Sequence, residues 1–558
     1  MQFQSSSHIP LPMLFVPGKD QSIQDAGRTA GVLLRETGRF FMRGGALVEV
    51  LRENDSEPYL RPIKSTQLTS EMELVAQIVK IKSDEVELTV LNTTQAQLIM
   101  DSSSFRKEIP EIKILSKCPV LSFAKDQTLR IITGHDKESG ILSFTSSPEE
   151  VSLSSAIDLL LSLIADFNFA SPPDRSRAIA ALITPDLIFG QLIRGRAPLQ
   201  VIEADESQTG KGFLVKLIAA IHNHRPHAIT QRKGVGGGIE ESLNMRLIKG
   251  DSFISFDNIR DKIDSPALES LLTEDHDLAR IPYMPPIDID PRRIVLFLTS
   301  NQCEMTKDLT NRSSMIQLRK QEPGYAFKTF PEGDIVDHVL ANSSRYHGAI
   351  IAIIKEWVLQ GCPETDENRH DFRKWVRVLD WIVQHIIGLP ALMGGHKETQ
   401  QRLVNKPLNW MRSVAFMIVK SGKQQIWLRT GDILDIIEES EVPIPGLKAS
   451  QQLTDGTRTN VLTAMGKEFG ACFRFNPKAT IDDSGFDEIA VDDIIVQRKL
   501  VTETRGTSGS CEVKEYRFAK VEPSPAATSL LLAASIATVA TVHSETISSD
   551  SNSRRAVL

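Results

Sequence analysis

The sequence has few cysteines, and none is placed for metal or disulfide chemistry. Five cysteines occur among the 558 residues, and they lie far apart in the chain: Cys118, Cys303, Cys362, Cys472 and Cys511. No C-x-x-C pair occurs, which argues against a zinc site and against a disulfide framework. The spacing favours a reducing cytoplasm as the place where this protein works.

The sequence also lacks the features of a targeting signal and of a membrane span. The first twenty residues have neither the charged start nor the long apolar core of a signal peptide. A late apolar run, 526–542, is rich in threonine and is shorter than the roughly 20 apolar residues that a spanning helix needs. We expect no membrane partner, and we interpret 521–558 as a low-complexity tail.

An overall positive charge is missing as well. The net charge is −7 and the isoelectric point is about 6.0, so any surface that binds nucleic acid must be a local basic patch on an acidic body. Hydrophobic residues make up 41% and charged residues 24% of the chain, which is typical of a soluble globular protein with several packed cores.

Changes in composition and in hydrophobic pattern along the chain predict five parts. These are a β-rich module (1–150), a core of alternating strands and helices (151–330), a helical lid or collar (331–410), a winged-helix-like module (411–520) and the tail (521–558). In the first part we expect a hairpin around Gly44-Gly45 and strands in 86–100 and 129–144. In the core, the helix that opens the stretch 174–193 has Asp174 as its expected N-cap. Two apolar strands, 252–259 and 292–301, are separated by helices and indicate a parallel sheet covered on both faces.

A phosphate-binding loop is the first candidate for chemistry. The template is G-x-x-x-x-G-K-[ST], and Gly210-Lys211 fits its GK pair, between the apolar strand 198–204 and the helix 212–224. Asp205 then replaces the first glycine, and Gly212 replaces the hydroxyl residue that normally holds Mg²⁺.

In such a loop the lysine reaches the β- and γ-phosphates, while backbone N–H groups cradle them. Thr209, Gly210, Gly212 and Phe213 would line the nucleotide site around Lys211, and Phe213 would also bury the helix against the sheet. Because the loop hydroxyl is missing, Mg²⁺ would rest on an acidic residue elsewhere, with waters and phosphates completing its shell.

Four further polar residues come at or after the ends of the next two strands. Asp257 ends the strand 252–257 and is a candidate Mg²⁺ ligand, followed by Asn258, which can orient a water but cannot take its proton. Asn301 ends the next strand and can contact the γ-phosphate or the attacking water. Arg312 comes eleven residues later and can act on a neighbouring subunit's nucleotide. Each residue alone is equally compatible with a turn or with a solvated side chain; their order on one frame favours a nucleotide site.

With these motifs the chain resembles the ATPase part of primase-helicase proteins from phages, plasmids and integrated mobile elements, close to the superfamily 3 and AAA+ helicases. The resemblance covers about residues 30–400. It rests on the segments FFMRGGALVEVL, CPVLSFAKDQTLRIITGHDKESGILSF, IADFNF, SQTGKGFL, GDSFISFDNI, LLTEDHDLARI, VLFLTSNQ, DLTNRSSMIQLR and FRKWVRVLDWIV.

The resemblance implies an α/β fold with an AAA+-like P-loop NTPase core. It implies that Lys211 is the Walker A lysine, Asp257 the Walker B acid, Asn301 the sensor asparagine and Arg312 the arginine finger. Arg280 matches an arginine often present in the family, and its role stays open.

Three departures from the family pattern concern the rate of hydrolysis more than nucleotide binding. The family usually has Asn-Asn where this chain has Asn301-Gln302, and paired arginines where it has Asn311-Arg312. Asp205 stands where a glycine is frequent. No primase segment is evident in 1–150, so a separate primase would be a partner.

Two basic regions are candidates for nucleic-acid contact. Arg232 and Lys233 lie beside four glycines in the loop 230–241, where they could touch a sugar–phosphate backbone. The second region is the C-terminal hairpin of the winged-helix-like module, with Arg498, Lys499, Arg505, Lys514, Arg517 and Lys520. A solvated loop and a winged helix that contacts protein are the alternatives.

The sequence therefore predicts an ATP- and Mg²⁺-dependent DNA helicase or translocase that serves replication of a mobile genetic element, assembled as a homo-oligomeric ring around DNA. A non-catalytic, ATP-gated DNA-binding or initiator protein is one alternative, favoured by Gly212 and Asn258. An ATPase that acts on protein in host defence is the other.

Overall fold

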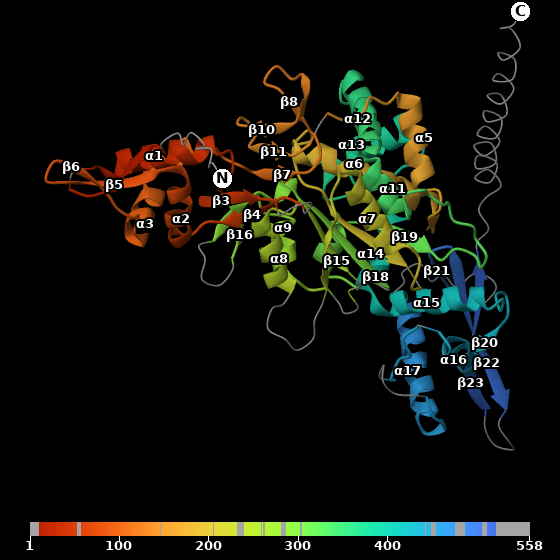
Figure 1. Ribbon diagram of the computed structural model, residues 1–558. Coiled ribbons are helices and arrows are strands. Elements are labelled where there is room, and N and C mark those ends of the chain that lie inside the picture. Colours follow the sequence, from red (N-terminus) through yellow and green to blue (C-terminus); the bar gives the residue numbers. More distant parts are fainter. Residues whose placement is uncertain are drawn as a thin grey trace, which may run out of the picture. The chain divides into compact units, whose positions relative to one another are not determined.

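The computed structural model describes residues 11–19, 21–52, 57–145, 147–204, 206–230, 239–257, 259, 263–280, 286–301, 304–440, 442–447, 453–474, 486–504 and 510–520. The chain divides into two compact units, Met1–Val404 and Asn405–Leu558, whose elements are labelled in Figure 1. Within the described ranges, no helix combines the length and the apolar character needed to cross a bilayer. The boundaries predicted at 150 and 330 fall inside the first unit and stay predictions.

The described residues up to position 150 form small sheets with helices between them. The strands are β1 (Met13–Phe15), β2 (Phe40–Arg43), β3 (Ala46–Leu51), β4 (Tyr59–Pro62), β5 (Gln77–Lys82), β6 (Glu85–Leu88), β7 (Ile114–Ser116), β8 (Val120–Phe123), β9 (Leu129–Ile132), β10 (Gly134–Asp136) and β11 (Ile141–Ser143). The helices are α1 (Ile23–Glu36), α2 (Ser65–Val75), α3 (Thr93–Asp101) and α4 (Ser103–Glu108). The strands pair in the orders β1-β5-β6, β2-β3-β4, β10-β11-β7 and β8-β9.

The predicted hairpin is confirmed, but the description of this part as β-rich omitted its helices. β2 and β3 pair with Arg43 opposite Ala46, and Gly44 and Gly45 take φ values of 51° and 84°, which glycine adopts without strain. The strand predicted over 86–100 is wrong beyond residue 88, because Asn92 accepts a hydrogen bond from the N–H of Gln95 and starts α3.

A six-stranded sheet forms the centre of the first unit. Its strands are β12 (Asn168–Phe169), β13 (Leu199–Ala204), β14 (His227–Thr230), β15 (Phe253–Asp257), β18 (Val295–Asn301) and β19 (Ser313–Arg319). They lie in the order β12-β19-β13-β18-β15-β14. Apart from β12, which runs antiparallel to β19, the neighbouring strands are parallel. The expected parallel sheet is therefore present.

Helices and short connections complete this part of the unit. They are α5 (Leu153–Leu163), α6 (Pro172–Phe189), α7 (Lys211–Ile221), α8 (Ile239–Lys249), α9 (Pro266–Leu271), the hairpin β16 (Asp277–Ala279) and β17 (Ile287–Ile289), a 3₁₀ turn at Pro291–Arg293 and α10 (Lys307–Asn311). The N-cap of α6 is Ser171 and not Asp174, because the Ser171 hydroxyl accepts from the N–H of Asp174.

The helices that follow belong to the same hydrophobic core as the sheet. They are α11 (Ile335–Ala341), α12 (Ser343–Leu359), α13 (Arg373–Trp381), the π-helical stretch Ile382–Ile387 and α14 (His396–Val404). Ile183 of α6, Leu217 of α7, Ile350 of α12 and Trp375 of α13 are buried in one cluster. Since burying each such side chain is worth about 1.5–3 kcal/mol, this cluster fixes α7 between the sheet and the later helices.

The second unit packs three helices on an antiparallel sheet. The helices are α15 (Lys406–Lys420), α16 (Thr430–Ile437) and α17 (Asp455–Arg474), and the strands are β20 (Leu428–Arg429), β21 (Asp487–Val491), β22 (Ile494–Thr504) and β23 (Ser510–Lys520). The strand order is β20-β23-β22-β21. Met465 and Phe469 of α17 pack with Tyr516 and Phe518 of β23 in its core.

Candidate functional site: the carboxyl edge of the parallel sheet

The glycine–lysine loop joins a buried strand to a helix. β13 is buried along its length up to Ala204, and α7 begins at Lys211. Gly210 caps α7 with a φ of 89°, and a Cβ added there would lie 3.2 Å from the ring of Phe167. The turn therefore requires glycine at this position. It puts the N-terminus of α7, with its unsatisfied N–H groups, at the carboxyl edge of the sheet.

Lys211 meets Asn301 at this edge. Ala204 of β13 lies opposite Asn301 of β18 in the parallel register, so the loop after one strand faces the end of the other. The Lys211 ammonium donates to Asn301 Oδ1 at 2.6 Å and to the backbone oxygen of Glu206 at 3.3 Å. The structure thus brings together two residues that the sequence assigned to one site.

Asp257 lies one strand further along the same edge. β15 neighbours β18, with Phe256 opposite Leu298, and the Thr299 hydroxyl donates to Asp257 Oδ1 at 2.6 Å. Thr299 is two residues before Asn301, so both side chains project from the same face of β18. Thr299 was missed in the sequence, although a hydroxyl inside an apolar strand, two residues before a polar strand end, was a usable signal.

The groups gathered at this edge fit a magnesium–triphosphate complex. A lysine ammonium and the N-terminus of α7 supply positive charge for phosphate oxygens, and the half-buried Asp257 carboxylate is an oxygen ligand of the kind Mg²⁺ accepts. In parallel sheets ligands bind outside the carboxyl ends of the strands, where the connections diverge. Here β13 connects through α7 to β14, which lies beyond β18 and β15, while β18 connects across β13 to β19 on the other side.

Three other residues of the loop, Thr209, Gly212 and Phe213, were predicted to line the site around Lys211, and their surroundings differ. Thr209 is nearly buried, with its hydroxyl 3.4 Å from the Lys211 ammonium. Gly212 faces open space, since a Cβ there meets no atom within 4 Å. Phe213 does not bury α7 against the sheet as predicted; it is 45% exposed, with Lys216 5.7 Å above its ring. Position 213 lies on the solvent side of the first turn, and Leu214 takes the buried side.

Arg312 is not part of this group within one chain. It precedes β19, and its backbone oxygen accepts from the N–H of Leu199 at the start of β13. Arg312 thus lies at the amino edge of the sheet, about 17–20 Å from the carboxyl edge for a six-residue strand. Its guanidinium is 22% exposed and 3.8 Å from Asp308. It could reach a nucleotide only on another subunit. Arg280 is exposed after β16, with no contact to the loop among its described interactions.

A buried ion pair anchors the loop strand and was also missed in the sequence. Glu203, the residue before Ala204, accepts two hydrogen bonds from Arg402 of α14, at 3.1 and 2.7 Å, and both side chains are buried. Removing one partner of such a pair costs about 3–5 kcal/mol, since it leaves a buried charge uncompensated. No local sequence signal links positions 203 and 402.

Several predicted residues lie elsewhere. Asn258, Arg232, Lys233 and Arg505 are outside the described residues, so their roles stay predictions. Arg498 and Lys499, in the second unit, are adjacent on β22 and have different surroundings: Arg498 pairs with Asp487 and lies 4.3 Å from the ring of Phe473, whereas Lys499 pairs with Glu515 at 3.0 Å and lies 4.3 Å from the ring of Trp427.

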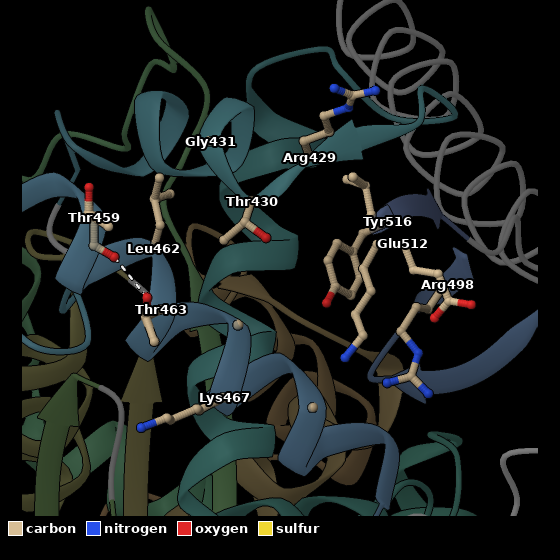
Figure 2. A pocket seen from close by; sticks show the side chains of 14 residues that line it. Arg429, Thr430, Gly431, Thr459, Leu462, Thr463, Lys467, Arg498, Glu512 and Tyr516 are labelled. Atoms are coloured by element: carbon tan, nitrogen blue, oxygen red, sulfur yellow. Dashed lines mark hydrogen bonds between the residues drawn. The ribbon is translucent and has the colours of Figure 1, made fainter. Parts of the chain in front are cut away.

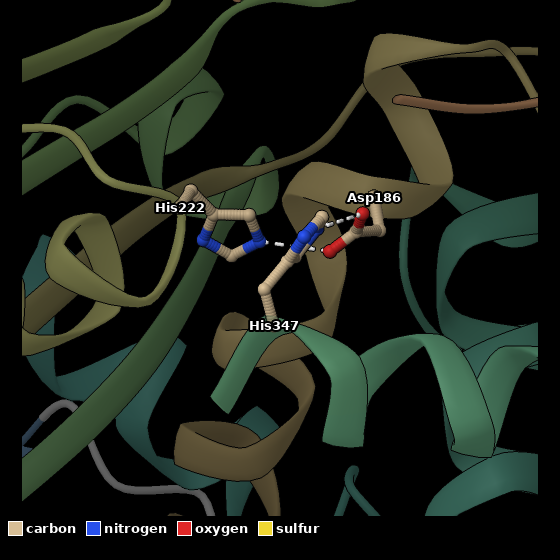
Figure 3. Close-up of side chains that lie close together, drawn as sticks. All are labelled: Asp186, His222 and His347. Carbon is tan, nitrogen blue, oxygen red and sulfur yellow. Dashed lines mark hydrogen bonds and ion pairs between the residues drawn. The ribbon is translucent and has the colours of Figure 1, made fainter. Parts of the chain in front are cut away.

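A buried cluster at the end of α7 that is farther from the glycine–lysine loop has the composition of a metal site. Asp186 of α6, His222 at the end of α7 and His347 of α12 point toward one another (Figure 3). His222 Nε2 and His347 Nε2 each lie 2.8 Å from a different oxygen of Asp186, and His222 Nδ1 lies 2.9 Å from the backbone oxygen of Ile218.

Protons account for these contacts without a metal. Asp186 has one oxygen within hydrogen-bonding distance of each histidine, and both nitrogens of His222 lie within hydrogen-bonding distance of an oxygen. Burial alone would raise the pKa of Asp186, but His347 and His222 hold it below its usual value. Burial alone would lower the pKa of His347, but the carboxylate raises it well above the usual value. We assign the triad a structural role, which is to hold the loop helix α7 against α6 and α12.

Comparison with known proteins gives distant similarity only. No protein-family model matches the sequence, and no curated protein matches it. Among solved structures, the C-terminal region of NrS-1 is 10% identical with a TM-score of 0.32, covering 78% of this chain and 86% of that one. The SCCmec type IV Cch helicase is 11% identical with a TM-score of 0.30, covering 85% and 91%. A putative ATPase from Cytophaga hutchinsonii is 11% identical with a TM-score of 0.22, covering 48% and 71%. TM-scores of this size do not establish a shared fold, and the function proposed below rests on the geometry of the site.

The open space at Gly212 allows a direct test of the missing hydroxyl. Gly212→Thr should fit without a clash and should place a hydroxyl where phosphate loops hold Mg²⁺. We expect the Mg²⁺ concentration for half-maximal nucleotide hydrolysis to fall several-fold. Gly212→Val, which has the same shape without the hydroxyl, is the control; an equal change in both variants would contradict the metal contact.

The charge state of the triad predicts a pH-dependent loss of stability. Asp186→Asn should lower the free energy of unfolding by about 3 kcal/mol near pH 6, since it breaks a buried ion pair. The raised pKa of His347 means that this contribution is complete below about pH 6.5 and is lost as the pH rises through the folded-state value. The difference in the free energy of unfolding between wild type and Asp186→Asn, measured with denaturant, should therefore decrease in alkaline solution. The exposed Asp158→Asn serves as the control, and a difference that is constant with pH would contradict the assignment.

Proposed function

We propose that this protein is an ATP-dependent DNA helicase or translocase that works as a homo-oligomeric ring, in replication of a mobile genetic element. The observation that carries the nucleotide part is the 2.6 Å contact between the Lys211 ammonium and Asn301, one strand away from the Asp257 carboxylate. A cation, an amide and an acid at the carboxyl edge of a parallel sheet are the groups that phosphoryl transfer requires.

Each residue has a distinct task in this proposal. Lys211 neutralises charge on the β- and γ-phosphates, and the N–H groups at the start of α7 bind their oxygens. Asp257, oriented by the Thr299 hydroxyl, holds Mg²⁺ together with waters. Asn301 contacts the γ-phosphate, and its present contact with Lys211 would then be exchanged for contacts with the nucleotide. When bound, Mg²⁺ supplies neutralisation of the charge that develops on the phosphate oxygens.

Arg312 would act on the nucleotide of the neighbouring subunit. Its position at the amino edge of the sheet excludes a contact with the loop of its own chain, and arginine fingers supplied by a neighbour raise hydrolysis rates by about 10³–10⁵. A ring of identical subunits, each giving an arginine to the next, satisfies this requirement through one repeated interface.

One observation favours a second candidate, a DNA-binding or initiator protein that binds ATP without hydrolysing it. Gly212 supplies no hydroxyl for Mg²⁺, although the site has room for one. A site that binds triphosphate but holds the metal from one side only would serve as a switch and not as a motor. Both candidates bind ATP, but only the helicase or translocase hydrolyses it.

Lys211→Ala separates these candidates. For the helicase we expect DNA-stimulated phosphate release to fall about a hundredfold or more, since the main charge at the phosphates is removed. Lys216→Ala, an exposed lysine in the same helix, is the matched control and should keep the wild-type rate. Negligible release by wild type and both variants, with ATP binding intact in wild type, would favour the non-catalytic candidate. DNA that neither binds nor stimulates release would contradict both.

Complementation tests the arginine finger. Arg312→Ala and Lys211→Ala should each be inactive alone, because one lacks the arginine and the other the phosphate-binding lysine. In an equal mixture, about a quarter of the interfaces would combine an intact lysine with an intact arginine, if subunits assemble at random. We expect phosphate release to recover to about that fraction of the wild-type rate. Arg345→Ala, an exposed arginine on α12, should be fully active. A mixture no more active than its components would contradict action between subunits.

A further inference from the structure

The C-terminal unit contains a groove of about 1010 Å³ between two helices and a hairpin. One face of α17 forms one wall, with Thr459, Thr463 and Lys467 at helical spacing. The hairpin β22–β23 forms the other wall, and Thr430 at the start of α16 lies between them. Figure 2 shows the side chains that line the groove, with those of α17 on one side and those of the hairpin on the other.

The charge of the groove is positive although the whole chain is acidic. Four cationic residues line it, Arg429, Lys467, Arg498 and Lys514, against one acidic residue, Glu512. Arg429 and Arg498 are already paired with carboxylates. Lys467 and Lys514 are exposed, and neither has an ion-pair partner among the described residues of the unit. The groove therefore has two cations available for an anionic ligand.

A buried hydroxyl at the wall of the groove also lacks a partner. Tyr516 of β23 is 0% exposed, its ring is stacked on Phe469 of α17 at 4.3 Å, and its hydroxyl makes no hydrogen bond within the described residues. Burial raises the pKa of this phenol to about 12, so it remains a donor at neutral pH. Figure 2 shows the hydroxyl on the side of the ring that faces α17. An unpaired buried donor costs about 1–3 kcal/mol, and an acceptor in the groove would remove that cost.

Two glycines leave the groove open. A Cβ at Gly431, in the first turn of α16, or at Gly466, inside α17, would meet no atom within 4 Å, and both residues line the groove. Glycine inside a helix, as at Gly466, costs about 1 kcal/mol relative to alanine, and no side-chain packing at either position requires glycine. Close approach of a ligand to the helix backbone accounts for them.

We propose that this groove binds the sugar–phosphate backbone of nucleic acid, with Lys467 and Lys514 on phosphates and the Tyr516 hydroxyl and the threonine hydroxyls donating to phosphate oxygens. A phosphodiester chain carries one negative charge on each phosphate, at regular intervals. The spaced cations and neutral hydrogen-bond donors of the groove match that pattern. The inference rests on the proposed function for the source of the ligand, a DNA strand or duplex. The sequence-based expectation already included Lys514 of the hairpin; the groove adds α17 to the contact and leaves out Arg498 and Lys499, which are both paired with carboxylates.

The test is a salt titration of DNA binding by the full chain, with labelled single-stranded and duplex DNA of equal length. By counterion release, each phosphate contact is worth about fivefold in affinity at about 0.15 M salt relative to about 1 M salt. The double variant Lys467→Ala, Lys514→Ala should therefore lose about 30-fold in affinity, and the slope of log affinity against log salt should fall by about 2. Lys423→Ala, an exposed lysine of the same unit outside the groove, should leave both quantities unchanged.

Two further variants test the shape and the hydroxyl without removing a cation. Gly466→Leu should block the groove and weaken DNA binding at least tenfold, while the melting temperature stays equal or rises because a helix glycine is replaced. Tyr516→Phe should weaken binding several-fold with the melting temperature unchanged. These variants should bind single-stranded and duplex DNA with unequal losses of affinity. The form of DNA whose binding is weakened more is the form that occupies the groove.

Wild-type affinity of both the double lysine variant and Gly466→Leu would overturn the proposal. So would equal affinity for polyglutamate of the same length, which would indicate an acidic protein ligand. The outcome is separable from that for hydrolysis. Groove variants that bind DNA normally, while Lys211→Ala abolishes phosphate release, contradict the groove only. Groove variants that lose DNA binding, while the wild type binds DNA but hydrolyses no ATP, contradict the motor only.

Discussion

The contact between the Lys211 ammonium and the Asn301 amide, 2.6 Å apart, joins residues 90 positions apart in the chain. It exists because β13 and β18 are parallel neighbours in a register that puts Ala204 opposite Asn301. The side chains of both strands are buried on both faces of the sheet, in two different cores. A slip by one residue would therefore move the side chains of a strand from one core to the other. The hydrophobic packing of the sheet thus determines where the charged groups meet.

Interactions behind the edge keep this geometry in place. The Glu203–Arg402 pair holds the end of β13, and the Asp186–His222–His347 triad holds the far end of α7. Both are buried ionic groups attached to the two elements that flank the loop, and both are expensive to break. Arg312 lies at the opposite edge of the sheet, too far from the loop of its own chain to contact it. In the proposed ring, the nucleotide site would therefore be completed where two subunits meet.

Local motifs and periodic patterns could be predicted from the sequence. Features that depend on contacts between residues far apart in the chain could not. The strand–loop–helix around Lys211, the strand ends at Asp257 and Asn301, and the hairpin at Gly44-Gly45 followed from periodicity and turn chemistry. The helix α3 was taken for a strand because its threonines have β propensity, while the Asn92 cap outweighs them. The pairing of Glu203 with Arg402 and the meeting of Asp186 with two histidines depend on tertiary packing and have no local pattern. The exposure of Phe213 depends on the rotation of α7 about its axis, which a short apolar run leaves undetermined.

The most direct measurement is an experimental structure of the full chain with Mg²⁺ and a non-hydrolysable ATP analogue. We predict that the β- and γ-phosphates lie at the N-terminus of α7, within hydrogen-bonding distance of the Lys211 ammonium. Mg²⁺ should lie on the Asp257 side of the phosphates, and Arg312 of a neighbouring subunit should approach the γ-phosphate. Nucleotide bound away from the carboxyl edge of the sheet, or at that edge without contact to Lys211, would contradict this prediction.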